Sequence, residues 1–205
     1  MGRRGRGRRN PWAKADRFTK QARDEGYAAR SVFKLKEVQQ RFRILQARQR
    51  VVDLGCSPGS WSRYVLEVIG KRGALVGVDI AEPQFVGGTV LHRSVTEVSS
   101  DEIRSALGGP AHVVLSDMAP RTTGNLLGDH VEQIALAQCA LDLAVALLLP
   151  GGSFLVKVFD GEDAPAFVAG MRPFFGKVKR LRPGAVRRES REFFVLGSDF
   201  KPPSQ

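Results

Sequence analysis

The stretch that decides the fold is VVDLGCSPGSW, residues 51–61. Its two valines predict the start of a buried strand, and a turn of small residues follows from Gly55 to Ser60. Apolar residues then recur at positions 61, 64, 65, 68 and 69, which is the spacing of one helix face. A strand, a small-residue turn and a helix begin a βαβ unit, and the glycines of such a turn let a ligand approach the backbone.

The turn alone does not identify the ligand. A phosphate-binding loop carries Gly-x-x-x-x-Gly-Lys-Ser/Thr and a dinucleotide fingerprint carries Gly-x-Gly-x-x-Gly, whereas the spacing here is Gly55-x-x-x-Gly59 with Pro58 inside it. The next apolar run ends at Asp79, whose carboxylate suits the two hydroxyls of a ribose. A turn built for tight packing, followed by a solvated aspartate, would give the same pattern.

Length and composition predict one folded domain. The 205 residues are 42% hydrophobic, which is enough for a full core. The two cysteines, Cys56 and Cys139, lie far apart in unlike contexts, which predicts reduced thiols and a cytoplasmic protein. We expect no signal peptide, because the N-terminus is rich in Arg and Gly with no apolar core behind it, and no membrane span, because the longest apolar stretch, around residues 144–149, is short.

Charge is distributed unevenly along the chain. The formal net charge is +11, yet acidic residues outnumber basic ones between positions 51 and 170, so the excess lies in residues 1–50 and 171–205. Two basic ends around an acidic middle predict contact with a polyanion, for which nucleic acid is the usual case. A solubilising tail is the alternative for the first ten residues. We expect a basic, partly disordered arm over 1–26, a single domain over 27–200 and a short tail over 201–205.

Strand and helix patterns alternate along the chain. Strands are predicted at 51–54, 74–79, 89–91, 111–117, 153–159, 176–180 and 193–196, and helices at 28–41, 61–69, 99–108, 131–149 and 164–171. This alternation indicates an α/β fold with a mostly parallel sheet. The last two strands follow one another closely, so one of them is expected to be antiparallel. Ligands of such sheets lie at the carboxyl ends of the strands.

Two lysines stand out. Lys157 interrupts the apolar strand FLVKVF, where a buried ammonium is costly unless it is paired. Its candidate partners are Asp117, at the end of the neighbouring strand, and Glu192; a purely structural lysine–aspartate pair is the alternative. Lys34 lies off the apolar stripe of its helix and could reach the open edge of the sheet, although alone it would be taken for a solvated lysine. The histidines and cysteines show no metal-ligand spacing, so no metal site is predicted.

Five stretches in chain order together resemble the RrmJ/FtsJ family of S-adenosylmethionine-dependent ribose 2′-O-methyltransferases. They are residues 30–35 (RSVFKL), 51–62 (VVDLG and PGSWS), 116–120 (SDMAP), 150–159 (PGGSF and VKVF) and 190–192 (SRE). The resemblance runs over nearly the whole chain, from Trp12 to Gly197. Any one of the motifs would be weak evidence, but the ordered set is specific.

The resemblance implies both fold and site. It implies a Rossmann-like, mostly parallel seven-stranded sheet with one antiparallel strand and helices on both faces. The family's Lys-Asp-Lys-Glu tetrad matches four positions here: Lys34, Asp117, Lys157 and Glu192. The residues implied for S-adenosylmethionine are Gly55, Gly59, Trp61, Asp79, Ser94 and Asp117. The bacterial member methylates a uridine ribose of large-subunit (23S) ribosomal RNA within the ribosomal subunit, which would be the partner here; a monomer is expected.

Methyl transfer from a sulfonium is an in-line displacement in which positioning supplies much of the rate. A lysine can serve as the base only if its pKa is lowered, by desolvation or by a second cation such as Lys34. Our hypothesis makes Lys157 the base or steering group, oriented by Asp117, with Lys34 and Glu192 holding the ribose.

The chain departs from the family pattern at two places. The family usually has an acid after the third strand for the adenine amino group, whereas His92-Arg93-Ser94-Val95 stands here. Ser94, a backbone carbonyl or Glu97 could make that contact. Cys56 occupies a position where small apolar residues are common, and we interpret it as a small residue rather than a catalytic thiol.

Two other function classes are weighed against this one. A nicotinamide-dependent oxidoreductase would require three glycines in the turn and would not require basic ends. A non-catalytic RNA-binding protein on the same scaffold would typically have lost part of the tetrad, and all four positions are filled here.

Overall fold

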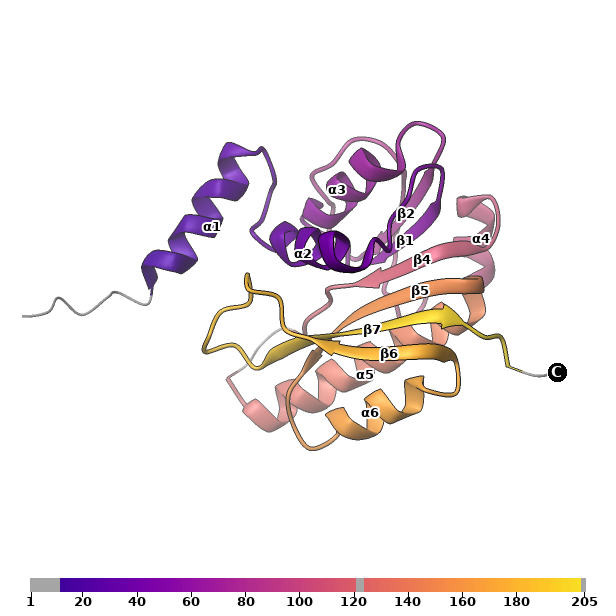
Figure 1. Ribbon diagram of the computed structural model, residues 1–205. Helices are drawn as coiled ribbons and strands as arrows, with labels where there is room; N and C mark the ends of the chain where they lie inside the picture. The colour runs from indigo at the N-terminus through magenta and orange to yellow at the C-terminus, as the bar shows by residue number, and fades with distance from the viewer. Residues whose placement is uncertain (1–11, 121–123, 204–205) are drawn as a thin grey trace, which may run out of the picture.

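The computed structural model describes residues 12–120 and 124–203 (Figure 1). Its centre is a seven-stranded sheet with strand order β3-β2-β1-β4-β5-β7-β6. The neighbours from β3 to β5 pair in parallel, and β7 runs antiparallel to both β5 and β6. The prediction of a mostly parallel sheet with one antiparallel strand is therefore confirmed, and that strand is β7.

The elements follow the expected alternation. In chain order they are α1 (Trp12–Asp24), α2 (Val32–Phe42), β1 (Arg50–Leu54), α3 (Ser60–Ile69), β2 (Ala74–Asp79), β3 (Thr89–His92), α4 (Ser100–Leu107), β4 (Ala111–Ser116), α5 (Leu126–Leu147), β5 (Leu148–Phe159), α6 (Ala164–Met171), β6 (Phe175–Leu181) and β7 (Glu192–Phe200).

Side chains alternate between the two faces of the sheet because successive strand residues point to opposite sides. Val52, Val114 and Phe154 pack with α4, α5 and α6 in one core, whereas Val51 and Leu155 pack with α2 and α3 in the other. Figure 1 shows the same two layers, with α2 and α3 above the sheet and α5 and α6 below it. Both faces are covered, which is why the central strands are almost continuously apolar.

Helix α1 was not predicted, because its sequence is strongly polar and basic. It ends in a small third cluster in which Ala22, Tyr27 and Phe33 are buried, and Phe18 lies 5.4 Å from Phe33 between ring centroids. Packing at the carboxyl end of α1 therefore helps to stabilise a helix that its composition does not predict. The expectation of disorder over the first ten residues lies outside the described part of the chain.

Helix α5 and strand β5 differ from their predicted bounds. The helix begins at Leu126, where the Asn125 side chain accepts a hydrogen bond from Gly128 N, and β5 begins at once after it, at Leu148. Residues Leu127–Leu147 are long and apolar enough to cross a membrane by length and composition, contrary to the expectation of a short apolar stretch. In the fold, Ala140, Ala144 and Leu147 of this helix are buried against the sheet.

Candidate active site

The turn after β1 meets the strands on both sides of it at the carboxyl edge of the sheet. Gly55 has φ +77°, donates its N–H to Val78 O at 2.8 Å, and has no room for a Cβ because the Met118 side chain occupies that place. The two carboxylate oxygens of Asp79 accept from Ser57 N at 2.9 Å and Ala81 N at 2.8 Å. Asp79 therefore fixes the turn, and each of its oxygens keeps a free lone pair for a ligand.

A cavity of about 500 Å³ opens beside this turn. Its walls come from the turn and from the ends of β2, β3 and β4, and its charged residues are Asp79, Arg93, Asp117 and Glu132. Gly55, Ser94 and Met118 also line it, whereas Glu97 does not. Three acids against one base make this cavity suited to a ligand that carries a positive charge.

Asp53 is a buried acid behind the site that was missed from the sequence. It is 1% exposed and accepts a 2.6 Å hydrogen bond from Ser62 Oγ. Burial raises its pKa to about 7 against that hydrogen bond, with Asp117 and Asp79 raising it further. Burial also raises the pKa of the adjacent Cys56 thiol, so Cys56 stays protonated as expected for a packing residue. An acid inside a buried apolar run was the available signal for Asp53.

Two of the predicted cofactor residues do not line this cavity. Gly59, at φ +110°, lies against Gln84 and Phe85 of the loop after β2. The Trp61 indole is 3% exposed, donates to Ser31 O at 2.9 Å and packs 5.8 Å from the Phe194 ring. Gly59 and Trp61 belong to the start of α3. The backbone N–H groups of this first turn have no partner within the helix and favour an anion such as a carboxylate.

The four predicted catalytic residues come together from four separate elements. Lys157 Nζ lies 3.1 Å from Asp117 Oδ1 and donates to Asp117 O at 2.6 Å. Lys34 Nζ lies 2.6 Å from Glu192 Oε1 and 3.9 Å from Asp117 Oδ1. Asp117 therefore joins both lysines, which resolves the choice of partner for Lys157. Its Oδ1 is buried and, among the described residues, its close contacts are the ionic ones to the two ammonium groups.

Gln133 of α5 holds the strand that carries Lys157. Strand β4 pairs with β5 only as far as Val156, so the backbone beyond that point lacks a strand partner on this side. The side chain of Gln133, which is 1% exposed, replaces the missing strand partner. Its Nε2 donates to Lys157 O at 2.7 Å and its Oε1 accepts from Phe159 N at 3.0 Å. No signal for this role exists at the level of sequence, because a glutamine in an apolar helix fits many settings.

A second cavity, of about 390 Å³, adjoins the lysine side of the tetrad. Lys34 and Glu192 line it together with Arg30, Arg187 and Ser190. Burial and the neighbouring Arg187 both lower the pKa of Arg30. The tetrad thus lies between the acidic cavity and a cavity lined by both cations and acids, the latter being Glu189 and Glu192.

A Rossmann-like sheet with one antiparallel strand and a cavity at its carboxyl edge is the architecture of the nucleoside-binding α/β class, to which many methyltransferases belong. The FtsJ-like methyltransferase family matches residues 27–200, and the chain belongs to that family.

Curated relatives agree with this assignment over nearly full length. The chain is 41% identical to the ribosomal RNA large subunit methyltransferase E of Desulfatibacillum aliphaticivorans, covering 92% of this chain and 91% of the relative. It is 44% identical to the protein of that name from Oleidesulfovibrio alaskensis, covering 91% and 92%. The fold matches the crystal structure of a Plasmodium falciparum ribosomal RNA methyltransferase with a TM-score of 0.73 at 22% identity, covering 85% of this chain and 98% of that one.

The acidic cavity fits S-adenosylmethionine. With the donor bound, Asp79 would offer a carboxylate to the ribose diol, Met118 and Val95 would provide an apolar surface for adenine, and Asp117 would place negative charge near a sulfonium. Gly55 supports this fit, because any side chain there would collide with Met118 at the cavity wall. Within residues 12–120 and 124–203 no group of three or more metal-ligating side chains occurs.

Proposed function

We propose that this methyltransferase transfers the methyl group of S-adenosylmethionine to the 2′-oxygen of a uridine ribose in large-subunit ribosomal RNA, in the cytoplasm and in the context of the ribosomal subunit. The observation that carries the proposal is the Lys34–Asp117–Lys157–Glu192 cluster, whose contacts of 2.6 to 3.9 Å lie between the acidic cavity and the second cavity. The names of the relatives support the choice of RNA.

Each residue of the cluster has a chemical part in this proposal. When bound, S-adenosylmethionine supplies an electrophilic methyl group on a sulfonium. Lys157 takes the proton of the 2′-hydroxyl or steers its lone pair as the bond from oxygen to carbon forms and the bond from carbon to sulfur breaks. Asp117 holds the amine of Lys157 by two contacts, and Lys34 with Glu192 positions the ribose.

On the donor side, we assign Asp79 to the ribose hydroxyls of S-adenosylmethionine and Ser94 to the neighbourhood of its adenine. Both side chains line the acidic cavity. The Ser94 hydroxyl lies 2.7 Å from the Thr96 hydroxyl, so one of its hydrogen bonds is already engaged. Gly59 and Trp61 would contribute backbone N–H groups from the start of α3 to the carboxylate of the donor.

The test is a map of 2′-O-methyl groups on ribosomal RNA from cells with and without the gene. We expect one uridine of the large-subunit RNA to lose its methyl group in the deletion and to regain it when purified protein and S-adenosylmethionine are added to the subunits. If every ribosomal 2′-O-methyl persists in the deletion, the proposed substrate is wrong.

A non-catalytic RNA-binding protein is the competing function. It predicts no affinity for the donor, so titration of S-adenosylmethionine by calorimetry separates the two. Binding at micromolar donor supports the enzyme, and no binding at high micromolar donor supports the alternative.

A further inference from the structure

A third cavity lies away from both halves of the active site, at the amino-terminal edge of the parallel strands. It has a volume of about 370 Å³ and is formed by the end of α2, the turn that opens β5 and the strands β6 and β7. Its cations are Arg43, Lys177 and Lys179, and no carboxylate lines it. We call this cavity the α2–β6 groove.

The cations of the groove are unpaired, in contrast to many others in the protein. Lys34, Lys36, Arg63 and Arg180 each form a salt bridge. In the described part of the chain, Arg43, Lys177 and Lys179 form none. Three exposed positive charges around one concave surface repel one another unless an anion neutralises them.

The side chain of Lys179 and the backbone of Arg43 are held in place. Lys179 Nζ lies 5.2 Å from the centroid of the Phe42 ring, a cation–π contact that leaves its outer side open. Arg43 caps α2 in the left-handed conformation, at φ 51°, and donates its backbone N–H to Gln39 O. The Gln39 side chain closes the linker after the helix through two hydrogen bonds with the backbone of Leu45, of 2.7 and 2.8 Å.

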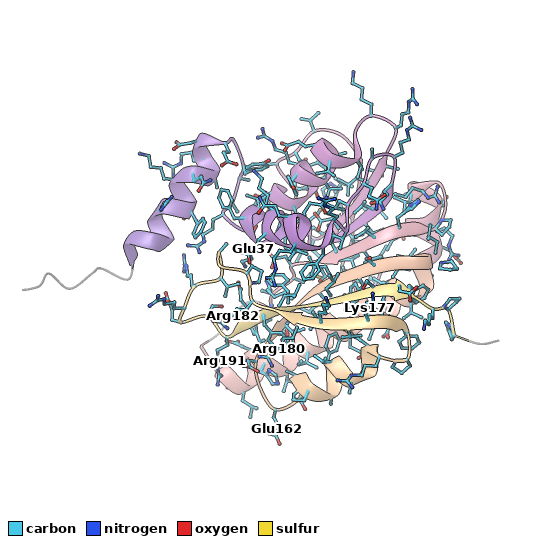
Figure 2. The ribbon with its side chains drawn as sticks, viewed as in Figure 1. Glu37, Glu162, Lys177, Arg180, Arg182 and Arg191 are labelled. Atoms are coloured by element: carbon cyan, nitrogen blue, oxygen red, sulfur yellow. The ribbon has the colours of Figure 1, made fainter. Side chains whose placement is uncertain are left out.

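Glu37, the acid of α2, does not neutralise the groove. Its Oε2 accepts from Gly184 N at 2.6 Å and its Oε1 lies 3.5 Å from Arg41. Figure 2 shows Glu37 above the strands, on the side of Arg182, while Lys177 lies toward the other end of β6. The carboxylate is therefore engaged away from the groove.

Protection of the sheet edge explains only part of this arrangement. Strand β6 is an edge strand, and lysines on edge strands prevent pairing with other chains. That accounts for Lys177 and Lys179, but it does not account for Arg43, which comes from the end of a helix, or for the concave shape. The three cations converge from two elements on one surface.

We propose that the α2–β6 groove binds the phosphate backbone of the RNA at a distance from the methylated nucleotide. Helix α2 links the two places: Lys34 lies in its first turn and Arg43 caps its end, roughly 13 Å further along the axis at about 1.5 Å per residue. The groove therefore fixes the RNA register for the tetrad without reading its sequence. This inference rests on the proposed function, because it takes RNA as the substrate.

The test measures RNA affinity as a function of salt concentration, with an unmethylated transcript of large-subunit RNA as the probe. For the double variant Lys177→Ala/Lys179→Ala we expect about tenfold weaker binding at low salt. The plot of log affinity against log salt should become shallower by about 0.7 to 0.9 for each phosphate that the variant no longer neutralises. The KM for RNA should rise, while kcat and the affinity for S-adenosylmethionine stay within twofold.

Three comparison variants make the result specific. Lys177→Arg/Lys179→Arg keeps the charge and should keep the slope. Arg43→Gly removes the guanidinium at a positive φ that glycine adopts readily, and should reduce the slope alone. Lys71→Ala/Arg72→Ala removes two exposed cations from the turn between α3 and β2, outside the groove. This variant should change the salt dependence of RNA binding less than the groove variants do.

An unchanged slope in both Lys177→Ala/Lys179→Ala and Arg43→Gly overturns the inference, and so does an equal loss in the Lys71/Arg72 variant. Wild-type protein that methylates the RNA while the groove variants bind normally leaves the proposed function standing. Wild-type protein that binds S-adenosylmethionine but methylates neither the transcript nor unmethylated ribosomal subunits overturns the proposed function instead.

Discussion

At the scale of single residues, Lys157 has the most constrained environment of the site. Its side chain is 7% exposed, and both of its polar contacts, at 2.6 and 3.1 Å, are to Asp117. Its position in an apolar strand marked it from the sequence, but the assignment of all four tetrad positions came from resemblance. Spacing along the chain does not reveal that residues 34 and 192 meet in space.

Lys157→Met is expected to lower kcat by on the order of 10² to 10⁴, because it removes the group that takes or steers the proton. Methionine fills a similar volume, so the affinity for S-adenosylmethionine measured by calorimetry should stay within twofold. Lys201→Met, at an exposed lysine, is the control. Near-full activity of Lys157→Met on the correct RNA would remove Lys157 from the mechanism.

Asp53 should make stability depend on pH. Its pKa rises from an ordinary 3.8 to about 7 in the folded protein, chiefly through burial, so the folded state binds the proton more tightly than the unfolded state. The contribution of Asp53 to the free energy of unfolding is then fully present below about pH 4 and is lost as pH rises to about 7. The whole contribution is on the order of 4 kcal/mol.

Asp53→Asn should flatten this dependence, as measured by urea unfolding between about pH 4.5 and 8. The exposed Asp142→Asn serves as the matched control and should retain the wild-type slope. A variant Asp53→Asn with the same loss of stability toward neutral pH would show that another group causes it.

At the scale of elements, most boundaries were predictable and the exceptions have physical causes. Helix α6 matches its predicted range, and α4 begins at the Ser99 cap, whose Oγ accepts from Glu102 N at 3.1 Å. Helix α1 escaped prediction because its narrow apolar stripe, Trp12, Ala15, Phe18 and Ala22, is embedded in a strongly polar and basic sequence. The early start of β5 places Pro150 and two glycines inside the strand range, but the register of β5 with β4 passes from Leu148 directly to Ser153, so these residues lie in an irregularity without strand partners.

The support of β5 by α5 can be tested at Gln133. Gln133→Met leaves Lys157 O and Phe159 N without their partner, so we expect the free energy of unfolding to fall by about 1 to 3 kcal/mol. Because the strand then holds Lys157 less firmly, kcat should fall while the KM for S-adenosylmethionine changes little. Reverting the Gln133→Met variant to glutamine should restore both the free energy of unfolding and kcat.

The control for this prediction is Gln138→Met on the outer side of the same helix, where the amide contacts only Asp142 in an exposed pair at 2.9 Å. It should leave both kcat and stability near wild type. A fall in stability without a fall in kcat for Gln133→Met would assign Gln133 a purely structural part.

At the scale of the whole molecule, the charge distribution separates two tasks. The cavity beside the turn after β1 is lined mainly by acids, the cavity beside Lys34 is lined by cations and acids, and the α2–β6 groove carries cations without carboxylates. The sequence indicated two basic ends, but it could not show that residues 177 and 179 from one end meet residue 43 from the other. That meeting depends on the packing of α2 over the last strands.

The arm over residues 1–10 contains five arginines, and we expect it to add affinity for RNA without selecting a sequence. Deleting these residues should lower RNA affinity and reduce the salt dependence of binding. The midpoint of urea unfolding should not move, since the deleted residues precede α1. An unchanged salt dependence would identify the arm as a solubilising tail.

The side-chain pairing of Gln133 with β5 also provides the site with a built-in reporter. The amide proton of Phe159 is held by Gln133 Oε1 and not by a neighbouring strand, so its exchange with solvent deuterium requires α5 and β5 to separate locally. Exchange at this one amide therefore measures how often the lysine-bearing end of β5 opens. Slower exchange after donor or RNA is added would show which ligand rigidifies that end before the methyl group moves.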